Sequence, residues 1–445
     1  MVITAFPAVR LPECPVFLPG DLDYAAEVAA FHTNIEHTPD IVVGARSTED
    51  VAMAIAHARD RGMTVAVQGG RHGLGPVTGG MLINTGRIDH VFIDPDTHVA
   101  RIGGGTKWSD VIVAAAPLGL MPVIGSTSDV GAVGYLLGGG VSPIARSHGF
   151  SSDYVESFTM VTAAGEVVEA TPTARPELFW ALRGGKSGFG IVTEVRFRLV
   201  EMSTIYAGVL AFEEEHIETV FRGWLDWTQA AHPQVTTSTA IMVMPDIEFV
   251  PPPFRGKRVI FLRFAFPGDA GLGAELAAPL RALAPVYVDM LGEMPASHFD
   301  RIHMDPTDPM PGWASGAQLS HADQEFANRW LARFGPGTES PFVMAELRHS
   351  GGPATREAAS VDAVTGRDAE YTTFLAAFFP PLFESIAPRA AGEAFRAFQE
   401  WMLPVANVNL LGENPLVRPW TPETQARLDA VRAHYDPEAV FTVRF

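Results

Sequence analysis

The chain has 445 residues, of which 47% are apolar and 19% are charged, so it can form two or three domains with buried cores. Its net charge of −19 argues against binding to nucleic acid or to an acidic membrane surface. No apolar run reaches the roughly 18 residues that a membrane span needs, and the single cysteine, Cys14, excludes an internal disulfide or a cysteine-based metal site.

Short apolar runs alternate with helical patterns over the first 200 residues. Ser47, followed by Asp50 three residues later, is typical of a helix N-cap and predicts a helix that ends at Gly62. Two further helices are expected at 108–116 and 176–182. The apolar runs predict strands at 41–43, 64–67, 81–84, 91–93, 100–102, 158–163, 167–170 and 191–200.

The pattern changes near Glu201, where glycine clusters stop and longer helical stretches begin. The stretch 292–318, rich in Pro, Met, His and Asp, is predicted to be a long ordered loop of the kind that often binds ligands. Its His298 and His303 lie five residues apart, which favours neither one helix face nor one strand face, so we expect no metal site there. Helices are expected at 214–231, 320–334, 379–402 and 422–434, and strands at 204–212, 258–266, 341–348, 371–378 and 440–443.

Glycines gather beside the expected strand ends of the first half. The clusters lie at 68–73, 103–105, 125–131 with its continuation to 138–140, and 184–190. Loops without side chains let backbone N–H groups approach a diphosphate closely. Each cluster alone is equally compatible with tight turns, but four of them within about 120 residues favour a large nucleotide cofactor.

Two familiar nucleotide-binding motifs do not fit these clusters. The sequence Gly185-Lys186-Ser187 resembles the end of a phosphate-binding loop, but Trp180 stands where that loop needs its first glycine. The dinucleotide-binding spacing that starts at Gly103 also fails, because Trp108 occupies the place of the third glycine. The sequence therefore favours neither a nucleoside triphosphatase nor a simple NAD-binding unit.

A resemblance to a known family rests on several longer motifs. They are 65–73 (VAVQGGRHG), 130–140 (VGAVGYLLGGG), 153–155 (DYV), 178–185 (LFWALRGG), 347–352 (LRHSGG) and 435–441 (YDPEAVF). In these the chain resembles the FAD-linked oxidases of the vanillyl-alcohol oxidase type (PCMH-type FAD-binding domain), in their berberine-bridge-enzyme-like branch. The likeness is strong over most of 20–200, recognisable in the last 40 residues and weaker between them.

The resemblance implies an α+β fold with a two-part FAD-binding domain. That domain would comprise residues 1–200 and a C-terminal berberine-bridge-like segment, 406–445, that returns to it. Residues 201–405 would form an α+β substrate-binding domain with an antiparallel sheet. The resemblance assigns FAD to Gln68, Gly69, Gly70, Arg71, His72, Gly73, Gly125, Ser126, Thr127, Val130, Gly131, Gly134, Gly138, Gly139, Gly190, Ile191, Val192 and Asn409.

His72 matches the histidine that in this family binds the flavin ring methyl covalently. Many relatives carry a second link from a cysteine, but Thr127 occupies that position here and Cys14 is remote, so we expect a link through His72 only. Val130 falls where relatives place a small aliphatic residue beside the oxygen-reacting carbon of the flavin, which favours an oxidase. Val130 is equally compatible with simple packing in the core.

The sequence offers several candidates for the catalytic base. Relatives use Tyr, Glu or Asp from the sheet of the second domain, which makes Tyr371 a candidate. Asn409 matches the family's Asn near the ring, but Leu410 replaces the aromatic residue that commonly follows. Glu346 and His349, which lie in the matched strand, are further candidates. A structural role remains open for each of these residues.

The expected function is an FAD-dependent oxidase that takes a hydride from an alcohol, amine or activated C–H bond of a small organic molecule and passes the electrons to dioxygen, giving hydrogen peroxide. A flavin dehydrogenase with another acceptor, or a flavin-binding protein without catalysis, stays open. The first 20 residues lack a signal-peptide pattern, so a cytoplasmic location is expected. The expected partners are substrate and dioxygen, without nucleic acid or membrane, and the oligomeric state is undefined.

Overall fold

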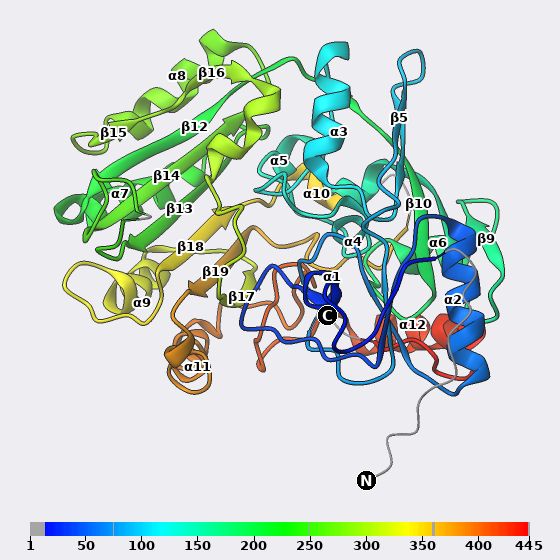
Figure 1. Ribbon diagram of the computed structural model, residues 1–445. Coiled ribbons are helices and arrows are strands. Elements are labelled where there is room, and N and C mark those ends of the chain that lie inside the picture. The colour runs from blue at the N-terminus through cyan, green and yellow to red at the C-terminus, as the bar shows by residue number, and fades with distance from the viewer. Residues whose placement is uncertain (1–13, 74, 249, 358–360, 444–445) are drawn as a thin grey trace.

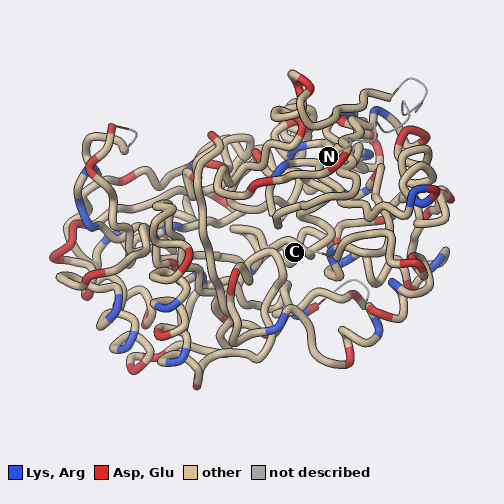
Figure 2. Tube along the Cα trace, turned by 60° about the horizontal axis from the view of Figure 1, so that its bottom comes forward, with Lys and Arg blue, Asp and Glu red and all other residues tan. Residues whose placement is uncertain are grey.

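The computed structural model describes residues 14–73, 75–248, 250–357 and 361–443. Its strands form four sheets, one of eight strands and three smaller. Figure 1 shows the eight-stranded sheet on one side of the molecule and the smaller sheets on the other. Acidic and basic residues are interspersed around both sides (Figure 2). None of the helices in the described ranges has the length and hydropathy that a membrane crossing requires.

The first small sheet has the order β1-β2-β4-β3, with β2 and β3 parallel to β4. Its strands are β1 (Val16–Phe17), β2 (Ile41–Gly44), β3 (Val65–Gln68) and β4 (Met81–Asn84). Helix α2 (Thr48–Asp60) begins where Ser47 accepts a hydrogen bond from the N–H of Asp50, as expected for an N-cap. Its Val51, Ala54 and Ile55 are buried. The short helix α1 (Tyr24–Val28) contacts β2.

The second small sheet is antiparallel throughout, in the order β5-β6-β10-β8-β9. Its strands are β5 (Val91–Asp94), β6 (Val99–Gly103), β8 (Val155–Val161), β9 (Val167–Ala170) and β10 (Ile191–Arg198). A two-stranded ribbon pairs β7 (Leu120–Met121) with β11 (Val200–Glu201). The helices of this part are α3 (Trp108–Ala115), α4 (Ala132–Leu136), α5 (Ala145–His148), α6 (Pro176–Leu182) and α12 (Pro422–Tyr435).

The large antiparallel sheet has the order β15-β12-β14-β13-β18-β19-β17, with β16 also on β12. Its strands are β12 (Thr204–Glu213), β13 (Thr236–Val243), β14 (Arg258–Phe266), β15 (Val288–Asp289), β16 (Gly292–Pro295), β17 (Trp313–Leu319), β18 (Met344–His349) and β19 (Tyr371–Ala377). The remaining helices are α7 (Ile217–Thr228), α8 (Ala270–Arg281), α9 (Gln324–Phe334), α10 (Pro353–Arg356) and α11 (Ile386–Phe398). Short 3-10 turns lie at Ala116–Leu118, Ser151–Tyr154, Glu214–His216, Ala296–Ile302 and Pro380–Leu382.

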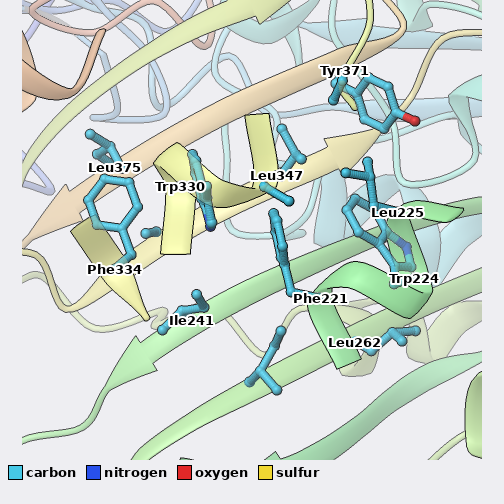
Figure 3. Close-up of a cluster of buried hydrophobic side chains, with 14 of the residues drawn as sticks. Phe221, Trp224, Leu225, Ile241, Leu262, Trp330, Phe334, Leu347, Tyr371 and Leu375 are labelled. Atoms are coloured by element: carbon cyan, nitrogen blue, oxygen red, sulfur yellow. The ribbon is translucent and has the colours of Figure 1, made fainter. Parts of the chain in front are cut away.

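One face of the large sheet packs against helices. Trp224 of α7 and Trp330 of α9 are fully buried there, beside Ile241, Leu262 and Leu347 of the strands (Figure 3). Since side chains alternate along a strand, the residues between these point to the opposite face. That opposite face carries Ser238, Arg263, Glu346 and Arg348, and we call it the polar face.

Most predicted elements of the first half are present within a few residues, but two expectations are wrong. The stretch 292–318 is not one loop, because β16 pairs with β12 and β17 pairs with β19. The segment 440–443 is not a strand: only Phe441 forms a bridge, to Val65, because the N–H groups of Val440 and Phe441 donate to the carboxylate of Asp436. Of the first 20 residues, 1–13 lie outside the described part of the chain.

Candidate active site

Three of the glycine clusters meet through their backbones. A Cβ atom on Gly70 would lie 2.4 Å from Cα and N of Gly131, and one on Gly69 would lie 2.8 Å from the carbonyl oxygen of Gly104. Real Cβ atoms do not approach so closely, so side chains are excluded where 69–70 and 130–131 touch. The structure thereby brings together two loops, 68–73 and 125–131, that are separated by 51 residues in sequence.

Other glycines serve tight packing inside the fold. A Cβ on Gly103 would lie 2.1 Å from the carbonyl oxygen of Ile88, and one on Gly105 would lie 2.2 Å from that of Thr85. In the last cluster, a Cβ on Gly190 would lie 2.3 Å from Cε of Met160. For the clusters at 103–105 and 184–190, the close approach of neighbouring chain segments is sufficient reason for glycine.

His72 lies at the meeting point of these two loops. Its ring stacks on Phe31 at a centroid distance of 3.9 Å, and its Nε2 lies 3.4 Å from Oδ2 of Asp129. Lys107 Nζ donates to the other carboxylate oxygen of Asp129 at 2.5 Å. Burial lowers the pKa of His72, and Asp129 only partly opposes this, so the imidazole is neutral at pH 7. With Nε2 directed at the carboxylate, Nδ1 is the nitrogen that keeps its lone pair.

The loop 125–131 is anchored to the second half of the chain. Ser128 donates from its N–H to Asp300 Oδ1 at 2.8 Å and from its hydroxyl to Oδ2 at 2.5 Å. Ser126 donates to Asp305 Oδ2 at 2.5 Å. Both aspartates belong to the stretch that the sequence marks as rich in His and Asp, and they bind serines of the glycine loop. In the described residues, no group of three or more His, Cys, Asp or Glu side chains is arranged to hold a metal ion.

Glu346 lies at the centre of the polar face and has no exposed surface. It accepts hydrogen bonds from Ser238 at 2.8 Å, from Arg263 Nη1 at 2.7 Å and from Arg348 Nε at 2.8 Å. Burial by itself would raise the pKa of Glu346, but Arg348 and Arg263 outweigh it and hold this pKa well below its usual range. Glu346 is thus a fixed anion, and it is poorly suited to accept a proton.

Tyr371 does not lie with Glu346 and its arginine partners. Its side chain points to the helix-covered face, where its hydroxyl lies 2.6 Å from Thr228 Oγ1 and accepts from Gln229 Nε2 at 3.1 Å. Figure 3 shows it beside Trp224 and Leu225 in the hydrophobic cluster. Tyr371 and Glu346 therefore lie on opposite faces of one sheet, and the structure favours a packing role for Tyr371.

Asn409 joins the end of α4 to the C-terminal part of the chain. Its Nδ2 donates to the carbonyl of Tyr135 at 2.8 Å, and its Oδ1 accepts from Lys186 Nζ at 2.7 Å. A Cβ on Gly138 would lie 2.0 Å from the same Oδ1, so glycine is required there. Both ends of the Asn409 amide are engaged by protein groups.

The other residues assigned to the cofactor fall into two groups. Gln68 is buried and donates to the carbonyl of Ala29 at 3.1 Å, while Ile191 and Val192 pair with β8 inside the second sheet. Arg71 has a left-handed backbone, with φ of 65°, directly before His72. The rest lie along the two meeting loops and the helix that follows them, namely Gly73, Gly125, Thr127, Val130, Gly134 and Gly139.

Glu346 was a candidate from the sequence, but several of its partners were not. Arg348 lies two residues from Glu346 on a strand, a spacing that puts both on one face and that would have revealed this pair. Arg263 and Ser238 come from other strands, and Asp129 becomes a partner of His72 only when the two loops meet. No local pattern connects these residues.

The junction of loops 68–73 and 125–131, with His72 beside it, lies in the part of the chain that known proteins match. Residues 39–171 match the family described as FAD binding domain. The chain thus carries a segment similar to FAD-binding domains, and this segment contains the motifs at 65–73, 130–140 and 153–155 that resemble the FAD-linked oxidases of the vanillyl-alcohol oxidase type.

Curated relatives match part of the chain. (R)-6-hydroxynicotine oxidase of Paenarthrobacter nicotinovorans is 35% identical over 190 residues, which cover 42% of this chain and 42% of the relative. Glucooligosaccharide oxidase of Sarocladium strictum is 30% identical over 214 residues, covering 46% and 43%. The matched segments thus span less than half of the length of these relatives.

Solved structures match nearly the whole chain in fold. 6-Hydroxy-D-nicotine oxidase from Arthrobacter nicotinovorans superposes with a TM-score of 0.82 at 22% identity, covering 97% of this chain and 98% of that one. BBE-like 1 of Physcomitrella patens gives 0.83 at 17% identity, covering 97% and 96%. Glucooligosaccharide oxidase from Acremonium strictum, described with a 6-S-cysteinyl, 8α-N1-histidyl FAD, gives 0.78 at 20% identity, covering 96% and 95%. The expected α+β fold is confirmed.

Proposed function

We propose that the protein is an FAD-dependent oxidase that takes a hydride from an alcohol, amine or activated C–H bond of a small organic molecule and gives hydrogen peroxide with dioxygen. Bound FAD supplies the hydride acceptor and the route for electrons to oxygen. The glycine loops 68–73 and 125–131 would hold it through their backbones, and Val130 would lie near the ring. Related chains named as oxidases support this proposal.

The observation that carries the proposal is His72 at the junction of the two loops. Asp129 engages Nε2 and leaves the lone pair of Nδ1 for a bond to the ring methyl group. In that linkage one C–H and one N–H bond are replaced by a C–N bond. The two hydrogens leave as protons and electrons, which dioxygen takes up as hydrogen peroxide. Thr127 stands where relatives carry cysteine, so a single link is proposed.

Acid precipitation tests the linkage. The yellow colour should stay with the precipitated wild-type protein and should pass to the supernatant in His72→Ala. His57→Ala, which changes a histidine of α2 remote from the loops, is the matched control and should keep its colour in the pellet. Release of all flavin from the wild-type protein would disprove the covalent link without affecting FAD binding itself.

Oxidase activity is tested by reducing the holoprotein without air and then admitting air. Reoxidation within seconds, with hydrogen peroxide formed in equal amount to the flavin, is the expected result. Reoxidation over minutes or longer would indicate a dehydrogenase that uses another electron acceptor instead of an oxidase. Screening alcohols, sugars and amines for bleaching of the flavin would identify the substrate class.

A further inference from the structure

A small cavity lies where the polar face of the large sheet meets the first half of the chain. Its polar lining comes from Ser238, Arg263, Arg348 and Ser350 of the sheet side and from His303, which follows the turn Ala296–Ile302. Segment 141–143, directly after the glycine run 138–140, closes the other side. The cavity volume of about 20 Å³ is sufficient for a water-sized polar group.

Polar atoms of the lining lack partners. Both ring nitrogens of His303, a residue with 6% exposure, make no hydrogen bond within the described chain, and neither does Nε of Arg263, a residue with 3% exposure. The nearest group to His303 is Glu346, whose Oε1 lies 3.5 Å from Nε2. Buried polar groups without partners destabilise a fold. Their concentration around one cavity indicates that a polar ligand completes them.

The charges around the cavity do not balance. Arg263 and Arg348 carry two positive charges, and Glu346, which pairs with both, carries one negative charge. Burial and the adjacent Arg263 lower the pKa of His303, so its imidazole is neutral. One buried positive charge is therefore left over in a chain whose net charge is −19.

One neighbouring carboxylate opposes this excess without pairing directly. The negative charge of Asp305 raises the pKa of Arg348, but within the described residues Asp305 forms no ion pair with Arg348, and its Oδ2 accepts a hydrogen bond from Ser126. Arg146, which contacts His349 and the carbonyl of Gly351, carries a further positive charge at the end of β18. A buried charge is stable when it is paired, so a single anionic group fits the cavity.

We propose that this cavity binds a carboxylate group carried by the protein's small-molecule substrate. Arg263 Nε and Arg348 would donate to the carboxylate, and the neutral imidazole of His303 would donate its N–H. The contact of Ser128 with Asp300 joins this part of the second half to the loop 125–131, so the rest of the molecule would extend toward that loop. The identity of the bound molecule as substrate rests on the proposed oxidase function.

Titration of the purified flavin-containing protein tests the proposal. Sodium acetate and sodium benzoate are the probes, with benzyl alcohol and sodium chloride as controls at constant ionic strength. Calorimetry gives the dissociation constant, and the visible spectrum of the flavin reports changes near the ring. At least one carboxylate should bind at least about tenfold more tightly than benzyl alcohol, as expected for charge-assisted hydrogen bonds. Equal or weaker binding of both carboxylates overturns the proposal.

Two substitutions should shift the affinity in opposite directions. Arg348→Gln should weaken carboxylate binding by at least about tenfold, because it removes a charged donor. Glu346→Gln should strengthen binding, because it removes the competing negative charge. Arg258→Gln changes another arginine of β14 that is bonded to Thr338 outside the cavity, and it should leave the affinity unchanged.

His303→Phe covers the case in which Arg348→Gln does not fold. It fills the cavity without removing either of the arginines that pair with Glu346, and it should abolish carboxylate binding while flavin content is kept. Binding that is unchanged in His303→Phe overturns the proposal. A flavin-containing protein that binds no carboxylate leaves the oxidase function intact, whereas carboxylate binding by a protein that never acquires flavin contradicts that function alone.

Discussion

The glycine loops of the first half and the polar face of the large sheet contribute different things to the site. The loops contribute main chain, held so close at Gly70 and Gly131 that a side chain is excluded. The polar face contributes paired side chains, Glu346 with Arg263 and Arg348, from strands that are far apart in sequence. A cofactor common to many relatives can be held by backbone, whereas a substrate particular to one protein is selected by side chains.

We expect the largest effect of a substitution at the junction of the two glycine loops, 68–73 and 125–131. Gly70→Val would place Cβ 2.4 Å from the backbone of Gly131 and would force the two loops apart, at a cost of about 1–3 kcal/mol or more. We expect the loss of nearly all bound flavin, measured as flavin absorbance per folded chain. Gly292→Ala is the control, since no atom lies within 4 Å of its Cβ position. Normal flavin content in Gly70→Val would show that cofactor binding does not need this close approach.

On the polar face, the expected effect is on stability and not on flavin. Arg263→Met leaves the buried Glu346 without one of its two cationic partners, and we expect the free energy of unfolding to fall by about 3–5 kcal/mol. Denaturant unfolding of the apoprotein measures it. Arg263→Met combined with Glu346→Met should recover most of this loss. Equal destabilisation in the double variant would mean that packing, and not the ion pair, controls this region.

Acid should reduce the contribution of the polar face to the stability of the fold before it affects the glycine loops. The pKa of Glu346 in the folded protein lies well below the usual value of 4.5, so its ionised form stabilises the fold above pH 4.5. This contribution is lost as the pH falls below 4.5 toward the lower folded pKa. The stability advantage of the wild-type protein over Glu346→Gln should therefore shrink across that range. An advantage that stays constant between pH 7 and pH 3 would contradict the depressed pKa.

The first half of the chain could be predicted from its sequence more completely than the second half. The first half follows local rules: Ser47 caps α2, and the strands predicted at 158–163 and 167–170 correspond to β8 and β9, which pair antiparallel. The FAD-binding motifs are continuous segments, so they too are visible in the sequence. The sequence could not show which glycines line the loop junction. Glycine is also required for tight packing elsewhere, at Gly103 and Gly190.

In the second half, local sequence patterns do not predict the elements that are stabilised by tertiary contacts. Strand β13 was missed because its segment, 236–243, is rich in Thr and Ser, whose side chains are buried on the two faces of the sheet. Helix α8 contains glycines and Pro279, which oppose helix formation locally, but it is held by contacts with α7 and β12. The Arg263–Glu346 pair joins two strands 83 residues apart, so only the folded sheet reveals it.

The substitution of Tyr371 has the smallest predicted effect. It also separates the roles of the two faces of the large sheet most clearly. Its hydroxyl bonds to Thr228 and Gln229 on the face covered by α7 (Figure 3). Tyr371→Phe should lower the free energy of unfolding by about 1 kcal/mol, the usual worth of such hydrogen bonds. Flavin content, and the rate at which any substrate reduces the flavin, should not change. A catalytic base at this position would instead contribute about 100-fold or more to that rate, so a loss of this size with unchanged stability would return Tyr371 to the active site.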